Sequence, residues 1–132
     1  MPIIIDTTVV IACVVNEPHR EALLAATTDQ ELIAPQSLPW EVGNALSAMF
    51  KRRRIGLEDA LRAIDLFRRM PVELRVVDLE SAVRLSNQLH IYAYDAYVIQ
   101  SAVESRGEIL TLDAGLAAAA RAAKVPVREI KP

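Results

Sequence analysis

Four acidic residues lie at positions where a folded chain could use them for chemistry. Asp6 follows the apolar run Ile3–Ile5, and Asp113 follows a second apolar run near the other end of the chain. Glu41 and Asp95 lie at or near the starts of two expected helices. Ligands bind at the carboxyl ends of the strands in an open α/β sheet. If the two apolar strands are neighbours, all four carboxylates can converge at that edge.

Converging carboxylates need a counter-charge, because like charges a few ångströms apart raise one another's pKa values. Hard cations such as Mg²⁺ or Mn²⁺ take oxygen ligands and typically use a few carboxylates together with a substrate phosphate. Such an ion can activate water and polarise the phosphate. Helix starts at Glu41 and Asp95 would add positive potential for an anionic substrate. The pattern therefore favours a divalent-metal site that acts on a phosphate.

Each acid also has an ordinary structural explanation. Asp6, Asp95 and Asp113 could be helix N-caps, whose side chains accept hydrogen bonds from the first turn. Glu41 could be a first-turn acid that the helix dipole favours. For either strand-end aspartate alone the cap is the better interpretation, but four such acids together favour a site.

Strands that alternate with helices predict one α/β domain over residues 1–132, with a short parallel sheet and helices on both faces. Strands are expected at 3–5, 32–34, 74–77 and 109–112, with a final edge strand at 125–127. Helices are expected at 8–15, from 17 onward, at 37–54, 57–70, 78–89 and 95–106, and after 113. Asn16 should end the first helix and Gly107 the sixth. The two helices within 40–70 predict a projecting αα-hairpin.

Composition narrows the class of protein. Of the 132 residues 52% are hydrophobic, which suggests an apolar face buried against a partner. No run approaches the roughly 18 apolar residues of a membrane span. The start of the chain lacks the basic segment of a signal peptide, and the single Cys13 excludes an internal disulfide. We therefore expect a cytoplasmic protein that does not act at a membrane.

Basic residues are concentrated in one part of the chain, although the net charge is −2. Residues 51–84 hold nine of the fifteen Lys and Arg residues. A chain with a weakly acidic total can still carry a basic edge able to hold phosphate.

Four short motifs occur along nearly the whole chain: IIDTT at 4–8, WEVGNAL at 40–46, YDAY at 94–97 and LTLD at 110–113. In their order and spacing they resemble the PIN-domain family, and more narrowly the VapC-type toxin ribonucleases of type II toxin–antitoxin systems. The resemblance implies a PIN-like fold and a Mg²⁺- or Mn²⁺-dependent endoribonuclease that leaves a 5′-phosphate and a 3′-hydroxyl.

The resemblance also implies residue roles. Asp6, Asp95 and Asp113 would be metal ligands, and Glu41 would bind metal or orient the attacking water. Supporting positions are Thr8 and Thr111, which would orient carboxylates or waters, and Asn44, which would support Glu41. The implied partners are an RNA substrate, a cognate VapB-type antitoxin whose C-terminal segment covers or enters the acidic site, and a second copy in a homodimer.

Surface residues could serve these partners. The candidate antitoxin surface is Met49, Phe50, Leu57, Leu61 and Phe67. The run Lys51, Arg52, Arg53 and Arg54 is either a solvated helix end or a set of RNA phosphate contacts, and both interpretations remain open. Tyr92, Tyr94 and Tyr97 could stack on bases, although we expect at least two of them to be packed.

Three other classes of protein fit parts of this sequence pattern. A phospho-aspartyl receiver or phosphatase would carry a second acid beside or two residues after the first, where this chain has Thr7 and Thr8. A nuclease for DNA flaps would need additional DNA-gripping elements, for which the chain is short. A PIN-like RNA- or protein-binding module with weak or no nuclease activity is the main alternative, and the four intact acids argue against it.

Overall fold

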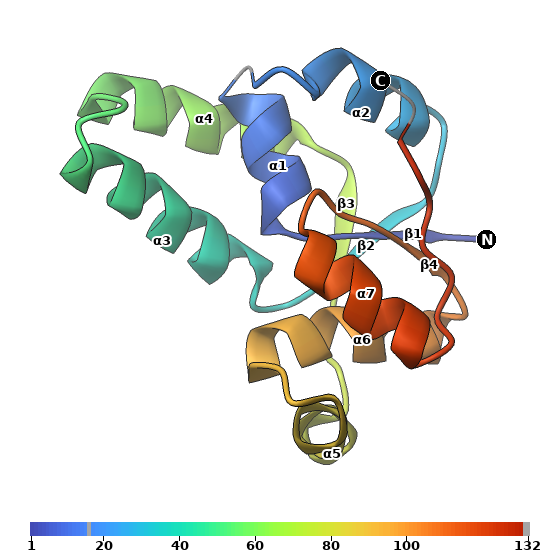
Figure 1. Ribbon diagram of the computed structural model, residues 1–132. Helices are drawn as coiled ribbons and strands as arrows, with labels where there is room; N and C mark the ends of the chain where they lie inside the picture. The colour runs from blue at the N-terminus through green and yellow to red at the C-terminus, as the bar shows by residue number, and fades with distance from the viewer. Residues whose placement is uncertain (16, 131–132) are drawn as a thin grey trace.

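A computed structural model of the chain describes residues 1–15 and 17–130 (Figure 1). The elements follow one another as β1 (Ile3–Ile5), α1 (Thr7–Val14), α2 (Arg20–Thr27), β2 (Leu32–Pro35), α3 (Leu38–Lys51), α4 (Leu57–Arg69), β3 (Val72–Arg75), α5 (Leu79–Leu89), α6 (Ala93–Ser105), β4 (Glu108–Leu110) and α7 (Ala114–Ala122). This order confirms the predicted α/β class. No helix in these two ranges is long and apolar enough to cross a membrane.

The four strands form one parallel sheet in the order β3-β2-β1-β4. In β1, Ile3 pairs with Leu32 of β2 and with Glu108 of β4. The strands before Asp6 and Asp113 are therefore neighbours, as the site hypothesis requires. Because all strands run the same way, the carboxyl ends of β1 and β4 meet at one edge of the sheet.

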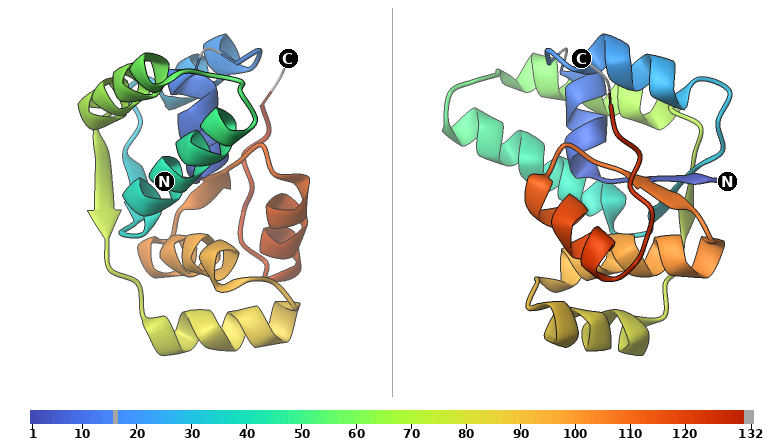
Figure 2. Two further views of the ribbon diagram at one scale, coloured as in Figure 1. Left: turned by 90° about the vertical axis from the view of Figure 1, so that its left-hand side faces the viewer. Right: turned by 45° about the vertical axis from the view of Figure 1, so that its right-hand side comes forward.

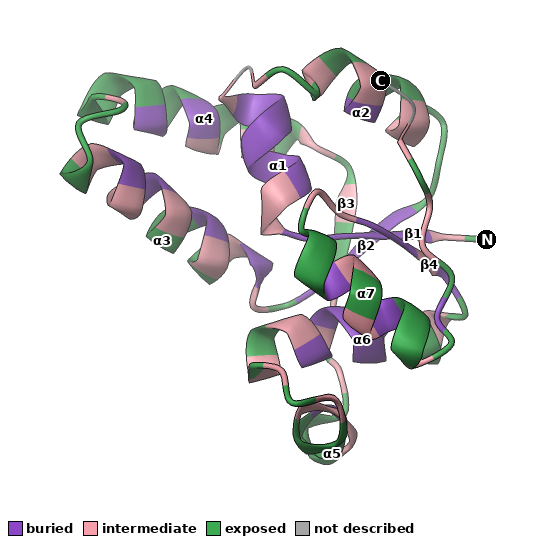
Figure 3. Cartoon of the chain, viewed as in Figure 1, coloured by how far each residue is buried: buried purple, intermediate pink, exposed green. Residues whose placement is uncertain are grey.

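Helices cover both faces of the sheet, as Figure 2 shows. Successive strand side chains point to opposite faces. Ile3 and Ile5 accordingly pack with α1, α2, α3 and α4, whereas Ile4 packs with α6 and α7. All three isoleucines are fully buried, and β1 lies within the buried centre of Figure 3. A run of consecutive apolar residues is the usual pattern of a parallel strand covered on both sides.

The predicted hairpin is present: α3 and α4 extend together to one side of the sheet (Figure 1). One prediction about its surface is wrong. Met49 is buried in the core, because it lies on the same face of α3 as Val42 and Leu46. Phe50 and Phe67 are half-buried, so Leu57 and Leu61 are the exposed members of the predicted antitoxin surface.

Several predicted boundaries shift. The second helix begins at Arg20 rather than near residue 17, and β3 is Val72–Arg75 rather than 74–77, since it pairs residue by residue with β2. The expected strand at 125–127 is a single bridge between Ile109 and Val127. Pro126 has no N–H to donate, so it contributes only its carbonyl, which accepts from the Ile109 N–H. The predicted helix end at Asn16 lies outside the described residues.

Gly107 has a different role from the predicted helix cap. Arg106 takes the left-handed conformation at the end of α6, with φ 57°. A Cβ on Gly107 would lie 2.7 Å from the Pro2 carbonyl oxygen and 2.8 Å from Ile4 Cδ1. Gly107 is therefore required because β4 enters the sheet in close contact with the start of β1.

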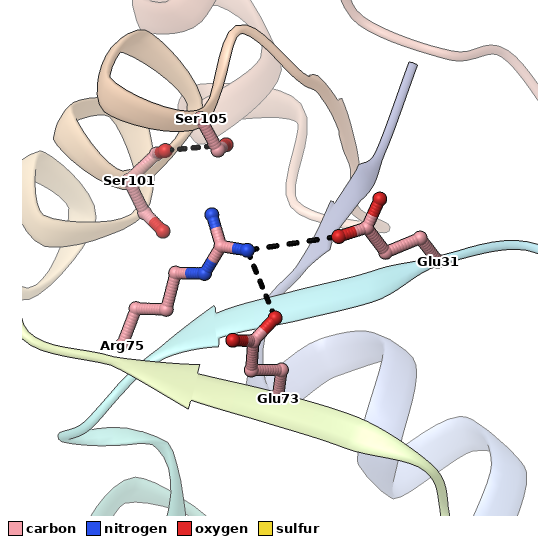
Figure 4. A network of polar contacts seen from close by, with 5 residues as sticks. All are labelled: Glu31, Glu73, Arg75, Ser101 and Ser105. Carbon is pink, nitrogen blue, oxygen red and sulfur yellow. Dashed lines mark hydrogen bonds and ion pairs between the residues drawn. The ribbon is translucent and has the colours of Figure 1, made fainter.

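The edge strand β3 carries an exposed ion-pair network, which Figure 4 shows. Arg75 Nη2 lies 2.9 Å from Glu73 Oε2 and 3.6 Å from Glu31 Oε1, just before β2. Ser105 and Ser101 of α6 lie nearby, where the Ser105 hydroxyl donates to the Ser101 carbonyl at 2.7 Å. Because exposed ion pairs add little stability, this network contributes little to the stability of the sheet edge.

Candidate active site

Asp6 is the centre of a hydrogen-bonded cluster at the carboxyl edge of the sheet. The residue is only 8% exposed. Thr8 Oγ1 donates to Oδ1 at 2.6 Å, and Thr111 Oγ1 donates to Oδ2 at 2.6 Å. The Val9 N–H also donates to Oδ1, at 3.3 Å. Both oxygens of this buried carboxylate are therefore held in place, and Oδ2, which accepts one hydrogen bond, keeps further acceptor capacity.

The two threonines connect β1 to the segment after β4. Thr8 Oγ1 accepts from the Leu112 N–H at 2.9 Å, and Thr111 Oγ1 accepts from the Asp113 N–H at 3.0 Å. The two hydroxyl oxygens lie 3.3 Å apart. These bonds fix the backbone before Asp113 relative to Asp6.

Asp113 and Asp6 are also helix caps. Asp113 Oδ1 accepts from the N–H groups of Gly115 at 2.8 Å and Leu116 at 3.1 Å, at the start of α7. Asp6 caps α1 through Val9. Each aspartate can therefore cap a helix and also belong to a site, because a carboxylate has more acceptor positions than a cap uses.

Glu41 is oriented by Ser37, a contact that the sequence interpretation missed. Ser37 occupies the N-cap position of α3, but its hydroxyl makes no cap hydrogen bond and instead donates to Glu41 Oε2 at 2.8 Å. The available signal was the spacing of Ser37 and Glu41, because side chains four residues apart at the start of a helix lie on the same face.

Asp95 lies in the first turn of α6, whose N-cap is Tyr92, so the cap interpretation of Asp95 is wrong. Burial raises the pKa of Asp95, and the charges of Asp113 and Asp6 raise it further. Burial also raises the pKa of Glu41, with further contributions from Asp6 and Asp95. The four predicted acids therefore form one electrostatically coupled group.

Burial dominates the environment of Asp6 as well. It raises the pKa of the carboxyl, the hydrogen bonds from Thr111, Thr8 and Val9 oppose this, and the charge of Asp113 adds to it. Perturbed carboxyls that influence one another in this way are typical of functional sites. The cost of ionising them falls when a cation is present.

The four acids offer the carboxylate oxygens that a hard divalent cation prefers, but their side chains do not converge on one position. Within residues 1–15 and 17–130, no three acidic, histidine or cysteine side chains converge as metal ligands. The hydrogen bonds explain this separation. Asp6 is turned toward the threonines, Asp113 toward α7 and Glu41 toward Ser37. A shared ion would have to draw these side chains together from an open arrangement.

Two adjoining cavities border the acidic cluster. The first, of about 310 Å³, is lined by Thr7, Trp40, Glu41, Asn44, Ala45 and Tyr94. Asn44 thus borders the same cavity as Glu41. Thr7 Oγ1 is buried and lacks a hydrogen-bond partner among the described residues.

The second cavity separates the basic run into two pairs. It has a volume of about 400 Å³ and is lined by Thr7, Thr8, Ile11, Glu17, Ala45, Ala48, Met49, Arg52, Arg54 and Leu112. Arg52 and Arg54 therefore border the space beside Thr8. Lys51 and Arg53 are not among the described residues that line either cavity. The sequence alone did not distinguish these pairs.

The tyrosines are more exposed than predicted. Tyr92 is 87% and Tyr94 58% exposed, so the expectation that at least two of the three tyrosines are packed is wrong. Tyr97 is half-buried and holds Tyr94 edge-to-face, with ring centroids 5.8 Å apart. Trp40, beside Glu41, is 80% exposed.

Comparisons with known proteins agree with this architecture. The model of the PIN domain family matches residues 3–122. A crystal structure of PAE2754 from Pyrobaculum aerophilum is similar, with a TM-score of 0.73 and 19% identity over 90% of this chain and 79% of that chain. VapC20 from Mycobacterium tuberculosis, described as a sarcin-ricin loop cleaving toxin, has a TM-score of 0.69 and 16% identity over 98% of this chain and 99% of its own. No curated protein sequence matches the chain. The family match and the parallel sheet lead to one conclusion: this chain belongs to the PIN domain family.

Proposed function

We propose that this protein is a cytoplasmic endoribonuclease that hydrolyses RNA phosphodiester bonds with Mg²⁺ or Mn²⁺, and that it is the toxin of a type II toxin–antitoxin pair. The observation that carries the proposal is the coupled acidic group around Asp6. Asp6 and Asp113 follow adjacent parallel strands, the charge of Asp113 raises the pKa of Asp6 and of Asp95, and the charges of Asp6 and Asp95 raise the pKa of Glu41. Acids that raise one another's pKa values in this way are stabilised as carboxylates when a cation binds beside them.

The choice of RNA draws support from the VapC20 likeness. That protein is described as a toxin that cleaves the sarcin-ricin loop, which is an RNA element. At 16% identity the likeness supports RNA as the substrate class but names no particular RNA for this chain.

Each residue has a role in the proposed reaction. Asp6, Asp95, Asp113 and Glu41 would hold the ion, which when bound offsets their charge, lowers the pKa of water and polarises the phosphate. Thr8 and Thr111 hold Asp6 in one orientation. Ser37 holds Glu41, and Glu41 would orient the attacking water. Water would attack the phosphorus in line, and the P–O3′ bond would break to leave a 5′-phosphate and a 3′-hydroxyl.

An apolar groove supports an antitoxin partner. It has a volume of about 530 Å³ between α3, α4 and β3, and its lining residues are Pro39, Trp40, Val42, Gly43, Ile64, Phe67, Arg68, Met70, Val72 and Leu74. Grooves between helices are common sites for an amphipathic segment of a partner. We propose a VapB-type antitoxin segment there, followed by a C-terminal part that covers the acidic site. Exposed Leu57 and Leu61 add apolar surface for that partner or for a second copy in a homodimer.

RNA cleavage by the purified chain tests the nuclease proposal. Structured and single-stranded RNAs are incubated with Mg²⁺ or Mn²⁺ and, separately, with EDTA. An Asp95→Asn variant, purified in the same way, controls for contaminating ribonuclease. Cleavage that needs both the metal and Asp95 is expected. Equal cleavage by Asp95→Asn would overturn the proposal.

The alternative is an RNA- or protein-binding module without nuclease activity, and the separation of the carboxylates favours it. Mn²⁺ affinity distinguishes the two functions, because a silent module has no need of the metal. Saturable Mn²⁺ binding that Asp6→Asn weakens supports the enzyme. RNA binding without any Mn²⁺ binding supports the module.

A further inference from the structure

Exposed aromatic side chains gather beside the acidic cluster. The chain contains one Trp, three Tyr and two Phe residues. Trp40 is 80% and Tyr94 58% exposed, and both line the cavity that also contains Glu41. Tyr94 is held from behind by the edge-to-face contact with Tyr97. A small domain that leaves its single tryptophan in solvent next to a candidate active site presents a flat surface for a ligand.

This cavity adjoins the one lined by Arg52 and Arg54, since the two share the lining residues Thr7 and Ala45. Together they follow one face of α3, from Trp40 to Arg52. At 1.5 Å per helical residue that face is about 18 Å long. Aromatic rings lie at one end, two guanidinium groups lie at the other, and Glu41 and Thr8 lie between them. We call this the α3 groove.

We propose that the α3 groove binds a single strand of RNA, with one unpaired base stacked on Trp40 against Tyr94 and a phosphate further along the same strand held by Arg52 and Arg54. The inference rests on the proposed function and adds a base-binding subsite to it. Bases of single-stranded nucleic acid stack on aromatic rings, and basic side chains follow the backbone. A base inside a duplex is already stacked and paired, so it cannot reach the ring.

RNA suits this groove better than a protein segment does. Apart from Ala45, the side chains that line the aromatic end beside Trp40 and Tyr94 are the polar Thr7, Asn44 and Glu41. The aliphatic surface lies on the other side of Trp40, in the groove lined by Ile64, Phe67 and Met70. At the basic end, Glu17 is the acid that accompanies the two arginines among the described lining residues. The charge of that end matches a phosphate backbone.

Trp40 provides a direct signal, because it is the only tryptophan of the chain. The Asp6→Asn variant, which keeps every groove residue, is titrated with single-stranded oligo(A), with the same oligonucleotide in an A·U duplex, and with inorganic polyphosphate. Saturable quenching of tryptophan fluorescence by oligo(A), without quenching by the duplex or by polyphosphate, is expected. Binding of oligo(A), followed by the anisotropy of a labelled strand, without quenching would overturn the proposal. So would equal quenching by polyphosphate, or the absence of any binding.

Substitutions test the same subsite in the binding assay. Trp40→Ala should weaken oligo(A) binding by roughly 5- to 150-fold, the range for loss of one base stack. Trp40→Phe should restore most of the affinity. Tyr92→Ala is the matched control, since Tyr92 is 87% exposed and is not among the described residues that line either cavity. Equal losses in Trp40→Ala and Tyr92→Ala would contradict the subsite.

The two proposals can fail separately. If oligo(A) quenches the tryptophan fluorescence and Trp40→Ala weakens binding, but no RNA is cleaved, the base subsite is supported and the nuclease proposal is wrong. Metal-dependent cleavage with unchanged KM and kcat in Trp40→Ala would leave the nuclease standing and remove the subsite. In that case Trp40 belongs to the apolar groove on its other side.

Discussion

Thr111 Oγ1 donates a 2.6 Å hydrogen bond to Asp6 Oδ2, joining residues that are 105 positions apart in the chain. With the matching bond from Thr8 at 2.6 Å, it leaves the buried carboxylate with one fixed orientation. Partners that orient a ligating carboxylate tune metal affinity although they do not touch the metal. This relationship makes a threonine after β4 part of the candidate active site.

Thr111→Val should lower metal-dependent RNA cleavage by roughly 10- to 100-fold, because it removes the hydroxyl but keeps the shape of the side chain. Thr111→Ser keeps the hydroxyl and should retain most activity. Cleavage rates over a Mn²⁺ series measure both, with circular dichroism as the folding control. Equal rates in the valine variant and the wild type would show that the hydroxyl has no role in the reaction.

Asp95→Asn should raise the melting temperature of the metal-free protein at about pH 7. The pKa of Asp95 is raised by burial and by Asp113 and Asp6. A raised native pKa means that the stability contribution is present at acidic pH and is lost as the pH rises through the native value. The gain should therefore shrink below about pH 4, the ordinary pKa of an aspartate, where both side chains are neutral. Saturating Mg²⁺ should stabilise the wild type more than the variant. A variant that melts below the wild type in EDTA at neutral pH would contradict this prediction.

Ser37→Ala should shift the acid side of the pH–activity profile to higher pH. The Ser37 hydroxyl donates to Glu41 and lowers its pKa, which burial raises. Without that bond, Glu41 stays protonated at a higher pH, and activity that needs the carboxylate is lost earlier on acidification. Ser47→Ala, further along α3, is the control. An unshifted profile in Ser37→Ala would mean that the ionisation of Glu41 does not limit the reaction.

Arg52 and Arg54 should matter more for RNA binding than Lys51 and Arg53. The first pair lines the α3 groove, whereas the second is not among its described lining residues. Arg52→Gln/Arg54→Gln and Lys51→Gln/Arg53→Gln remove the same charge from one run. The first double variant should bind RNA more weakly and show a smaller dependence of log affinity on log salt, because fewer counterions are released. Equal effects of the two double variants would indicate that the run 51–54 attracts RNA through its total charge rather than through particular contacts of Arg52 and Arg54.

Gly107→Ala should destabilise the fold by about 1–3 kcal/mol, as overpacking of a close contact does. The added Cβ would lie 2.7 Å from the Pro2 carbonyl oxygen, a backbone atom that cannot move without disturbing β1. Urea unfolding measures the change. The control is Gly43→Ala, since nothing described lies within 4 Å of a Cβ there.

The parallel sheet was predictable because Ile3–Ile5 and the run before Asp113 are short, apolar and followed at once by helices. The acids were predictable from their places at strand ends and helix starts. The orientation of Glu41 was not predictable. Ser37 stands where an N-cap is expected, and the rotamer of its side chain decides whether the hydroxyl bonds to the backbone or to Glu41. Nor could the sequence separate Arg52 and Arg54 from Lys51 and Arg53. Helix α3 ends at Lys51, and Arg53 adopts a positive φ of 56°, which no local sequence pattern indicates.

The most direct test of the central claim compares the wild type with Asp6→Asn on one RNA, in Mn²⁺ and in EDTA, and identifies the ends of the products. The account predicts products with 5′-phosphate and 3′-hydroxyl ends, formed only by the wild type and only with metal. The variant should lose more than the roughly 100-fold that removal of an orienting partner costs. Products formed by a folded Asp6→Asn variant at the wild-type rate, or formed equally in EDTA, would contradict a metal-dependent reaction at the acidic cluster.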